Sequence, residues 1–498
     1  TVAPTAAPTA ATTPCADEND GRQGWAHDGW CTKNPWMPQH CQKSCGVCES
    51  GGEAPTEAPP SEEGCSDGHA ECAGWAASGE CEKNPQWMKA ECQKSCHVCS
   101  NSDVVRNPDV VEMPRLHGMA YGPSPMLTVG TLPNDDFMMD GAELLWGETG
   151  RHDLAVMHGL GVNGVRLYGN DPQWNHKNFF DEAVKQDMHV IVGMSDWPYT
   201  QMNTPPNCLM TDYLCYDQLY ESYKANLETG GFLTEDKGYH PAILAVIVIN
   251  EPELKVGNTG ADTIDSPVNL GKRCKLLASA WDGMLQAEQD VGVTGRLARF
   301  TITWSFAKFL HPSKAPALGQ MEYFWECVQN PQRYGYTPKN DLKAAFLQRW
   351  VNGFNTQNWA SSLKGLIFEP YKKSVFPSLN IPVFIGEYHS INNEAGDLKK
   401  DLQELDGFQS SLFPFFKGFA FFELTRRYDK GHAGNQDMFG MFQFGEREIV
   451  KMVYFGENYS VRCLEPVLDL SGKKTMESFQ ELFASEAEDK SALNNALC

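Results

Sequence analysis

The sequence predicts an α/β protein whose main domain is a (β/α)8 TIM barrel, preceded by two small disulfide-rich modules. The chain has 498 residues, short apolar strands alternate with amphipathic helices from about residue 105, and 11 of the 17 cysteines fall within the first hundred residues. Eight strand–helix units fit a closed barrel with enlarged loops. An open, doubly wound sheet is the alternative, and the lack of a glycine-rich dinucleotide motif after the first strand disfavours it.

Low-complexity segments separate the expected domains. Residues 1–14 consist almost entirely of Thr, Ala and Pro, a composition that cannot bury a core and is typical of an O-glycosylated stalk. Residues 49–64 are rich in Glu, Pro and Gly and predict a linker. We therefore expect a first module at 15–48, a second at 65–99 and the barrel domain at 105–498.

The two modules repeat one another. Both contain a Lys-Asn-Pro segment, and both end in Cys-Gln-Lys-Ser-Cys-x-Val-Cys. This pattern resembles the ShKT module, a six-cysteine domain found in anemone channel toxins and fused to many secreted enzymes. Spacing alone leaves 15 connectivities open for six cysteines. The resemblance implies the pairs Cys65–Cys99, Cys72–Cys92 and Cys81–Cys96, with Cys15–Cys48 and Cys31–Cys45 in the first copy.

One cysteine of the first module lacks its partner. Arg22 stands where the second copy has Cys72, so we expect Cys41 to be unpaired, whether free, buried or joined to another chain. The Cys-x2-Cys endings also suggest a zinc site, but no second Cys/His pair follows at zinc spacing. We interpret the modules as stapled spacers or adhesion units that bind no metal and contact an extracellular matrix or cell-surface partner.

The remaining cysteines indicate a secreted protein. Six of them lie between Cys208 and Cys498 and can pair among themselves, and a Cys208–Cys215 bond would close a short loop. This cysteine density predicts an oxidising compartment, in agreement with a glycosylation sequon at Asn458. The chain starts without Met or an apolar leader, so we interpret it as a mature chain.

Composition also excludes several classes of partner. A formal net charge of −23 argues against nucleic acid and anionic membrane surfaces. The chain has no run of about 18 apolar residues, so we expect no membrane span. A neutral polysaccharide or a protein remains as partner, and we expect no metal or organic cofactor.

Eight apolar segments predict the barrel strands. They are Leu116–Tyr121, Gly164–Tyr168, His189–Met194, Leu244–Ile249, Phe300–Trp304, Gly353–Asn358, Val383–Gly386 and Gly418–Phe422. Helices are expected between most of them, for instance at Phe179–Gln186, Asn269–Gln289 and Leu398–Leu405.

Two of these strands end on a glutamate. Glu251 follows the fourth strand and Glu387 the seventh, and these two strand tips face one another across the mouth of an eight-stranded barrel. Cleavage of a glycosidic bond with retention requires two carboxyls, and these carboxyls must lie about 5–5.5 Å apart. We predict Glu251 as the general acid and base and Glu387 as the nucleophile.

Other residues are predicted to support this pair. Arg166, at the end of the second strand, would keep Glu387 ionised. The amide of Asn250 would hold a sugar hydroxyl, and Tyr168 and Tyr388 would donate hydrogen bonds to a carboxylate or to the sugar. Aromatic side chains at predicted loop tips would stack on sugar rings or pack in the core. They are Trp174, Trp197, Tyr199, Trp304 and Trp359.

Two further glutamates follow apolar runs. Glu369 precedes a proline, and we interpret it as the start of a helix, where a carboxylate is favoured by the helix dipole. Glu423 follows the eighth strand and is a candidate to line the same mouth, with a direct catalytic role as the less favoured interpretation.

Patches of the barrel sequence resemble known glycosidases. Asn-Glu after strand four and Glu after strand seven are similar to the clan A retaining glycoside hydrolases. Residues 160–176, LGVNGVRLYGNDPQWNH, resemble family 72, the β-1,3-glucanosyltransferases, and the Arg-x-Tyr-Gly feature also resembles family 17 β-1,3-glucanases. Residues 377–388 resemble the nucleophile strand of family 72. The sixth strand departs from that family, because Gln357 stands where the family carries a tyrosine that contacts the acceptor.

These features predict a secreted retaining glycoside hydrolase or transglycosylase acting on β-glucan, with β-1,3 linkages as the expected target. The reaction would proceed through a glycosyl–Glu387 intermediate that water or a second sugar resolves. The alternative is a catalytically idle barrel that serves as a structural or carbohydrate-binding component of an extracellular matrix or filament. Intact Glu251 and Glu387 argue against that alternative.

Overall fold

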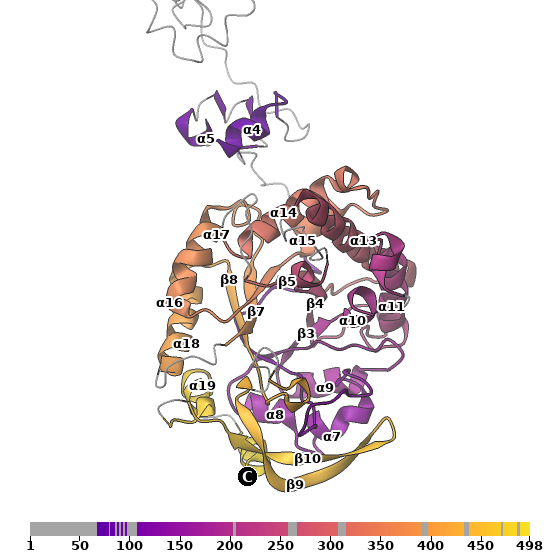
Figure 1. Ribbon diagram of the computed structural model, residues 1–498, viewed down its shortest axis with the longest axis vertical. Coiled ribbons are helices and arrows are strands. Elements are labelled where there is room, and N and C mark those ends of the chain that lie inside the picture. The colour runs from indigo at the N-terminus through magenta and orange to yellow at the C-terminus, as the bar shows by residue number, and fades with distance from the viewer. Residues whose placement is uncertain are drawn as a thin grey trace, which may run out of the picture. The chain divides into compact units, whose positions relative to one another are not determined.

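The computed structural model describes residues 67–498, apart from 79, 85–86, 89–90, 93–94, 97–106, 203–205, 257–265, 307–314, 390–396, 433–437, 470–471 and 486–488. Eight parallel strands close into a barrel in the order β1 to β8, which confirms the predicted fold class (Figure 1). The strands are β1 (Leu116–Ala120), β2 (Gly164–Arg166), β3 (His189–Gly193), β4 (Ile243–Asn250), β5 (Arg299–Trp304), β6 (Asn352–Thr356), β7 (Val383–Tyr388) and β8 (Phe416–Phe421).

The barrel closes where β8 pairs with β1. Leu116 on β1 is the register partner of Gly418 on β8. Gly418 has a φ of 107°, a conformation that L side chains rarely adopt, and a Cβ there would lie 2.0 Å from the carbonyl oxygen of Leu116. A glycine at this position therefore lets the first and last strands meet.

Helices follow the strands and form the outer layer. They are α7 (Glu143–Trp146), α8 (Asp153–His158), α9 (Lys177–Lys185), α10 (Trp197–Thr200), α11 (Tyr216–Glu228), α12 (Pro252–Lys255), α13 (Pro267–Val291), α14 (Leu318–Gln329), α15 (Leu342–Arg349), α16 (Ala360–Leu363), α17 (Glu369–Lys373) and α18 (Asp397–Gly407).

The longest of these helices, α13, extends two residues beyond the prediction at each end. The hydroxyl of Ser266 accepts a hydrogen bond from the backbone N–H of Asn269, and Pro267 occupies the first turn, so the helix begins earlier. Gly292 ends it in the left-handed conformation. The helix packs against α11 on the outside of the barrel.

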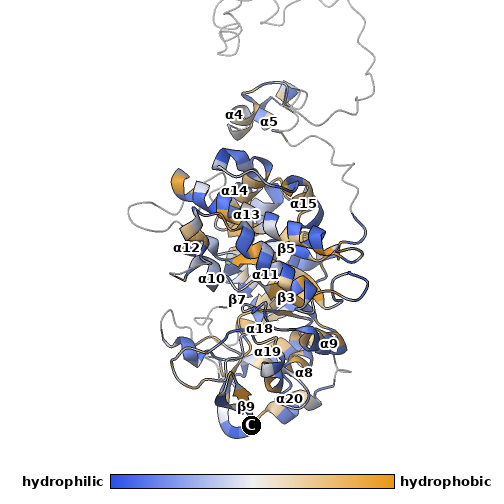
Figure 2. Ribbon diagram, turned by 90° about the vertical axis from the view of Figure 1, so that its right-hand side faces the viewer, coloured by the Kyte–Doolittle hydropathy of each residue, from blue (hydrophilic) through white to orange (hydrophobic). Residues whose placement is uncertain are grey.

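Strand alternation divides the core into two clusters. Ala245 and Ile247 of β4 join Ile191 of β3 and Phe384 of β7 in one buried cluster. Val246 of the same strand belongs to the larger cluster shared with the helices. The helices around the barrel, such as α11 and α13, carry hydrophilic and hydrophobic residues side by side (Figure 2). Because β4 is buried on both faces, its sequence is one continuous apolar run.

A two-stranded antiparallel hairpin follows the barrel and was not among the predicted strands. It consists of β9 (Phe442–Tyr454) and β10 (Glu457–Pro466), followed by α19 (Thr475–Phe483) and α20 (Ser491–Ala496), and lies beside α7 and α8 (Figure 1). The turn residues Phe455 and Gly456 both have positive φ, as a two-residue hairpin turn requires. Phenylalanine is a poor turn signal, which is why the sequence pattern did not reveal the hairpin.

The described part of the second cysteine-rich module has a small hydrophobic core of its own. It contains α4 (Cys72–Ala77) and α5 (Glu80–Lys83) around a core built on Cys72, Met88 and Cys92. Disulfides join Cys72 to Cys92 and Cys81 to Cys96.

Several sequence predictions lie outside the described residues. They are the stalk, the first module with its pairs Cys15–Cys48 and Cys31–Cys45, the unpaired Cys41, and the Cys65–Cys99 bond. The boundaries of the domains stay a prediction.

Candidate active site

Glu251 is held at the tip of β4 by an uncommon backbone conformation. Its φ and ψ are 47° and 54°, in the left-handed region that disfavours residues with a Cβ. The backbone N–H of Glu251 donates to the carbonyl of Thr303 on β5 at 2.7 Å, and the chain then turns into α12. Such conformations persist where the surrounding structure enforces them, and they are frequent at functional sites.

Glu387 lies on β7 and contacts two residues from the end of β2. Arg166 is the last residue of that strand, and Tyr168 follows two positions later. Arg166 Nη1 lies 3.0 Å from Glu387 Oε1, and the Tyr168 hydroxyl donates to the same oxygen at 3.1 Å. The Arg166 guanidinium also stacks on the Tyr168 ring, 3.4 Å from its centre. Arg166 is buried, whereas the Glu387 side chain remains 20% exposed. The carboxylate is therefore fixed and still reachable from the mouth.

Asn250 connects the two sides of the mouth. Its Oδ1 accepts hydrogen bonds from Arg166 Nη2 at 2.8 Å, from Thr303 Oγ1 at 2.7 Å and from Asn355 Nδ2 at 3.0 Å. With three donors on Oδ1, the orientation of the amide is determined. The Nδ2 group of Asn250, which lines a cavity, is the donor left for a ligand.

Asn355, on β6, is a site residue that the sequence pattern did not identify. Its Nδ2 donates to Glu251 Oε1 at 3.1 Å, and its backbone is the register partner of Glu387. A Cβ on Gly386 would lie 2.8 Å from Asn355 Oδ1, so the glycine before the predicted nucleophile leaves room for this amide. The available signal was its spacing: Asn355 stands two residues before Gln357 and shares its strand face.

The two carboxyls are both buried but differ in the charges beside them. Burial, and then the nearby charge of Glu387, raise the pKa of Glu251 to about 7, although the hydrogen bond from Asn355 lowers it. Burial also raises the pKa of Glu387, while the positive charges of Arg166 and Lys255 oppose that rise. Glu251 is thus the group suited to carry a proton near neutral pH, and Glu387 is the group with cations beside it.

The carboxyls lie between adjoining cavities. One cavity of ≈ 540 Å³ is lined by both glutamates, and one of ≈ 300 Å³ is lined by Arg166 and Tyr168. Phe422 lines both of them. A third cavity of ≈ 820 Å³ shares Trp197 with the second. The mouth is therefore an extended groove with the two carboxyls within it.

Most cations of the groove have a carboxylate partner. Lys255 Nζ donates to Asp196 and, at 2.6 Å, to the carbonyl of Asn250. Arg427 forms two hydrogen bonds with Asp429, at 2.8 and 2.7 Å. With these pairs and the Arg166–Glu387 pair, little positive charge is left to attract an anionic ligand, and a neutral one fits better.

The structure brings some of the predicted substrate-binding residues to the groove. Gln357 is exposed and lines the cavity that contains Glu251 and Glu387. Trp197 lines the second and third cavities and Tyr199 the third. Trp174 is exposed and contacts Phe455 at the hairpin turn instead.

Two predicted substrate-binding aromatics, Tyr388 and Trp304, lie in the core instead. Tyr388 follows Glu387 on the same strand, so it points to the opposite side, where its hydroxyl donates to Asp401 of α18 in the core. Trp304 is 2% exposed and packs near Phe324 of α14. Trp359 is the N-cap residue of α16 and is half-buried, and its contact with a substrate stays a prediction. The two further glutamates that follow apolar runs have different positions. Glu369 is the first residue of α17, whereas Glu423 lines the second cavity.

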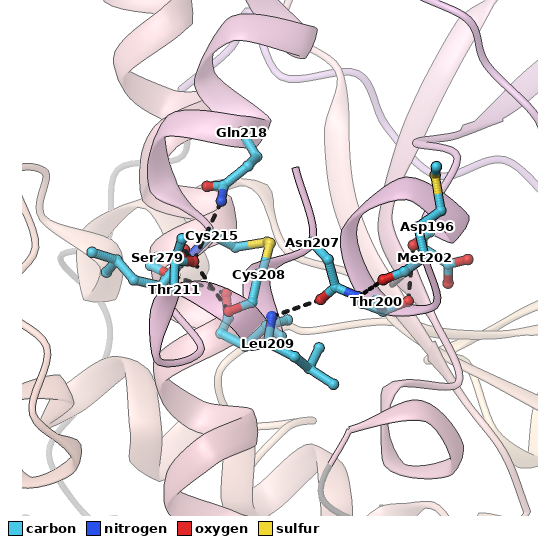
Figure 3. The surroundings of a disulfide bond; sticks show 12 residues. Asp196, Thr200, Met202, Asn207, Cys208, Leu209, Thr211, Cys215, Gln218 and Ser279 are labelled. Atoms are coloured by element: carbon cyan, nitrogen blue, oxygen red, sulfur yellow. Dashed lines mark hydrogen bonds between the residues drawn. A yellow bond between two sulfur atoms is a disulfide. The ribbon is translucent and has the colours of Figure 1, made fainter. Parts of the chain in front are cut away.

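A disulfide braces the loop that carries Asp196 and Trp197. Cys208 bonds to Cys215, and the backbone N–H of Cys215 donates to Ser279 of α13 at 2.8 Å (Figure 3). Asn207 beside it donates to the carbonyl of Met202 and accepts from the N–H of Leu209 at 2.7 Å. The loop is thereby tied to the outer helices of the barrel.

The other cysteines of the barrel domain are paired too. Cys274 of α13 bonds to Cys327 of α14, and Cys463 of β10 bonds to Cys498. Asn458 is exposed on β10, and its glycosylation stays a prediction.

Two negative findings apply to the described part of the chain. It has no group of three or more His, Cys, Asp or Glu side chains arranged to hold a metal ion. None of its helices combines the length and the hydrophobicity that crossing a membrane requires.

Comparisons with known proteins match both parts of the chain. The family model "ShK domain-like" matches residues 14–48 and 64–99, while a search of curated protein sequences gives no match. Similar solved structures include Saccharomyces cerevisiae Gas2p in complex with laminaripentaose, with 14% identity, a TM-score of 0.43 and coverage of 76% of this chain and 65% of that chain. Gas2p with laminaritriose and laminaritetraose has 13% identity, a TM-score of 0.42 and coverage of 77% and 69%. At these values the similarity is too low to indicate a function, and the chain spans about two thirds of the length of these structures.

Proposed function

We propose that this protein is an extracellular retaining glycoside hydrolase or transglycosylase that acts on β-glucan. The observation that carries the proposal is the pair of carboxyls in one groove, of which Glu387 is paired with an arginine and Glu251 is hydrogen-bonded to a neutral amide. Glu251 has a pKa raised to about 7, and Glu387 is paired with Arg166 at 3.0 Å. Enzymes that use two carboxyls at a glycosidic bond need one acid and one ionised group.

In the first step, Glu251 gives its proton to the oxygen of the glycosidic bond while Glu387 attacks the anomeric carbon. The bond between that carbon and the leaving sugar breaks, and a glycosyl ester forms on Glu387. The ion pair with Arg166 and the hydrogen bond from Tyr168 to Glu387 Oε1 hold the attacking group in place.

In the second step, Glu251 acts as a base. It takes a proton from water or from a sugar hydroxyl, whose oxygen attacks the anomeric carbon and releases Glu387. Asn355 Nδ2, at 3.1 Å from Glu251 Oε1, stabilises the ionised form that exists between the steps. Two inversions at the same carbon give net retention.

The substrate class rests on two supports. The cations of the groove are mostly paired, which suits a neutral polysaccharide. The β-1,3 linkage rests on the resemblance of residues 160–176 and 377–388 to family 72. Extracellular location is supported by the five disulfides of the described residues and the two ShK modules.

Incubation with laminarin-type β-1,3-glucan, followed by sizing of the products, tests the proposal. Shorter products indicate hydrolysis and longer products indicate transfer. If no product forms across a panel of β-glucans, the barrel is instead a structural or carbohydrate-binding component. Release of α-configured product from a β-linked substrate would exclude retention.

A further inference from the structure

Glu423 is a buried carboxyl at the groove to which the two-step reaction assigns no role. It is 1% exposed, follows β8, and lines the cavity that also contains Arg166 and Asn250. Its Oε1 has no hydrogen-bond partner. Leaving a buried polar atom without a partner costs about 1–3 kcal/mol. Because the Glu423 residue belongs to the lining of this cavity, a hydroxyl bound there can supply the missing bond.

The surroundings of Glu423 favour its neutral form. Burial raises its pKa to about 8, with further raising contributions from the charges of Glu387 and Asp429, while Arg427 and Arg166 lower it. A protonated carboxyl donates one hydrogen bond and accepts another. A sugar hydroxyl has the same two capacities, so the groups are complementary.

The residues around this carboxyl are closely packed and held in place. A Cβ on Gly122 would lie 2.6 Å from Arg427 Nη1 and 3.6 Å from Glu423 Oε2. Arg427 is fixed by its two hydrogen bonds to Asp429. The lack of a side chain at Gly122 therefore leaves room for the fixed Arg427 guanidinium close to Glu423.

We propose that Glu423 is a substrate-binding residue, which exchanges hydrogen bonds with a hydroxyl of the sugar ring attacked by Glu387. The inference rests on the proposed function and deepens it, because it assigns a neutral, hydroxylated sugar ring to the cavity on the Arg166 side of the groove. A ring that lacks this hydroxyl leaves Glu423 Oε1 unpaired and binds more weakly in the transition state.

The test compares Glu423→Gln and Glu423→Leu with the wild type on β-1,3-glucan. Glu423→Leu removes both hydrogen bonds and is expected to lower kcat/KM by about 10- to 100-fold. Glu423→Gln keeps a donor and an acceptor, cannot ionise, and is expected to lose less. Glu369→Gln, a glutamate at a helix start outside the groove, is the matched control. Thermal melting of each variant separates misfolding from lost binding.

The pH profile supplies a readout that a purely structural role would leave unchanged. In the wild type both Glu251 and Glu423 must carry a proton, so log(kcat/KM) falls above about pH 7 and reaches a limiting slope of about −2 above about pH 8. In Glu423→Gln one proton suffices, and the slope becomes about −1.

The outcomes separate the two proposals. If the wild type cleaves glucan and Glu387→Gln does not, the proposed function stands. An unchanged slope in Glu423→Gln together with wild-type kcat/KM in a folded Glu423→Leu then overturns only the role of Glu423. If the wild type cleaves no β-glucan, the proposed function fails, and the sugar assigned to Glu423 fails with it.

Discussion

Arg166 and Glu387 meet in the mouth of the barrel although their strands are not neighbours. Arg166 ends β2 and Glu387 lies on β7, and their Nη1 and Oε1 atoms are 3.0 Å apart. Strands β1 and β8 lie between them in the closed sheet. Only a barrel brings these two strand ends together, so the pairing depends on closure of the sheet and not on local sequence.

Removal of the nucleophile is the most direct prediction. Glu387→Gln keeps the shape of the side chain but cannot form the glycosyl ester, so kcat should fall by about 10⁴-fold or more. The rate of product formation from β-1,3-glucan measures the effect, and Glu369→Gln serves as the matched control. A Glu387→Gln enzyme with normal turnover would remove the nucleophile assignment.

Arg166 should control the acid side of the pH profile. Arg166→Lys cannot reach both Glu387 Oε1 and Asn250 Oδ1, since lysine lacks the planar fork of arginine. We expect kcat to fall by about 100-fold and the acid limb of kcat/KM to move to higher pH, because the lysine ammonium cannot take the exact place of the guanidinium beside Glu387 and so lowers the pKa of that carboxyl less. An acid limb that stays in place would contradict this role.

The acid and base role of Glu251 predicts chemical rescue. Glu251→Ala should lose activity on glucan but keep its first step on an aryl β-glycoside, whose leaving group needs no proton. Azide should then attack the glycosyl–Glu387 ester and release a β-configured glycosyl azide, which NMR identifies. Formation of an α-azide would show that the enzyme inverts.

The raised pKa of Glu251 also predicts a dependence of stability on pH. The carboxyl titrates near 4.5 when unfolded and at about 7 when folded, so its contribution to stability is complete below about 4.5 and is lost as the pH rises through 7. Glu251→Gln does not titrate. At pH 8 the free energy of unfolding of this variant should therefore exceed that of the wild type by roughly 3 kcal/mol. At pH 4.5 the two values should be equal. Urea unfolding at the two pH values measures the difference, and an equal gain at both would refute it.

The Cys208–Cys215 bond should affect substrate binding more than chemistry. Replacing both cysteines by serine releases the loop that carries Asp196 and Trp197, at a cost of about 2–3 kcal/mol for a loop of this length. We expect a higher KM, a lower melting temperature and a nearly unchanged kcat. The same change at Cys463 and Cys498, far along the chain, is the control and should leave KM unaltered.

Sequence patterns predicted the fold and the chain positions of the two carboxyls, because buried parallel strands read as continuous apolar runs and Glu251 and Glu387 directly follow such runs. They did not predict which way a side chain faces. Strand β7 continues through Tyr388, so a shift of one residue separates the groove from the core. Asn355 was missed although its two-residue spacing from Gln357 was visible, because an amide inside a strand indicates no role until its partners are known.

The sequence also did not predict backbone conformations that depend on tertiary contacts. The β9–β10 turn uses Phe455 and Gly456 with positive φ, and Glu251 adopts a left-handed conformation that its residue type disfavours. In both places, the surrounding structure overrides the local preference of the chain.

The three hydrogen bonds on Asn250 Oδ1 also affect the entropy of binding. A free amide rotates, and ordering it on a ligand costs side-chain entropy. In this protein, Arg166, Thr303 and Asn355 have already removed that freedom when the chain folds. A sugar that reaches Asn250 Nδ2 therefore meets a donor whose direction is set in advance, and the entropic cost has been moved from binding to folding.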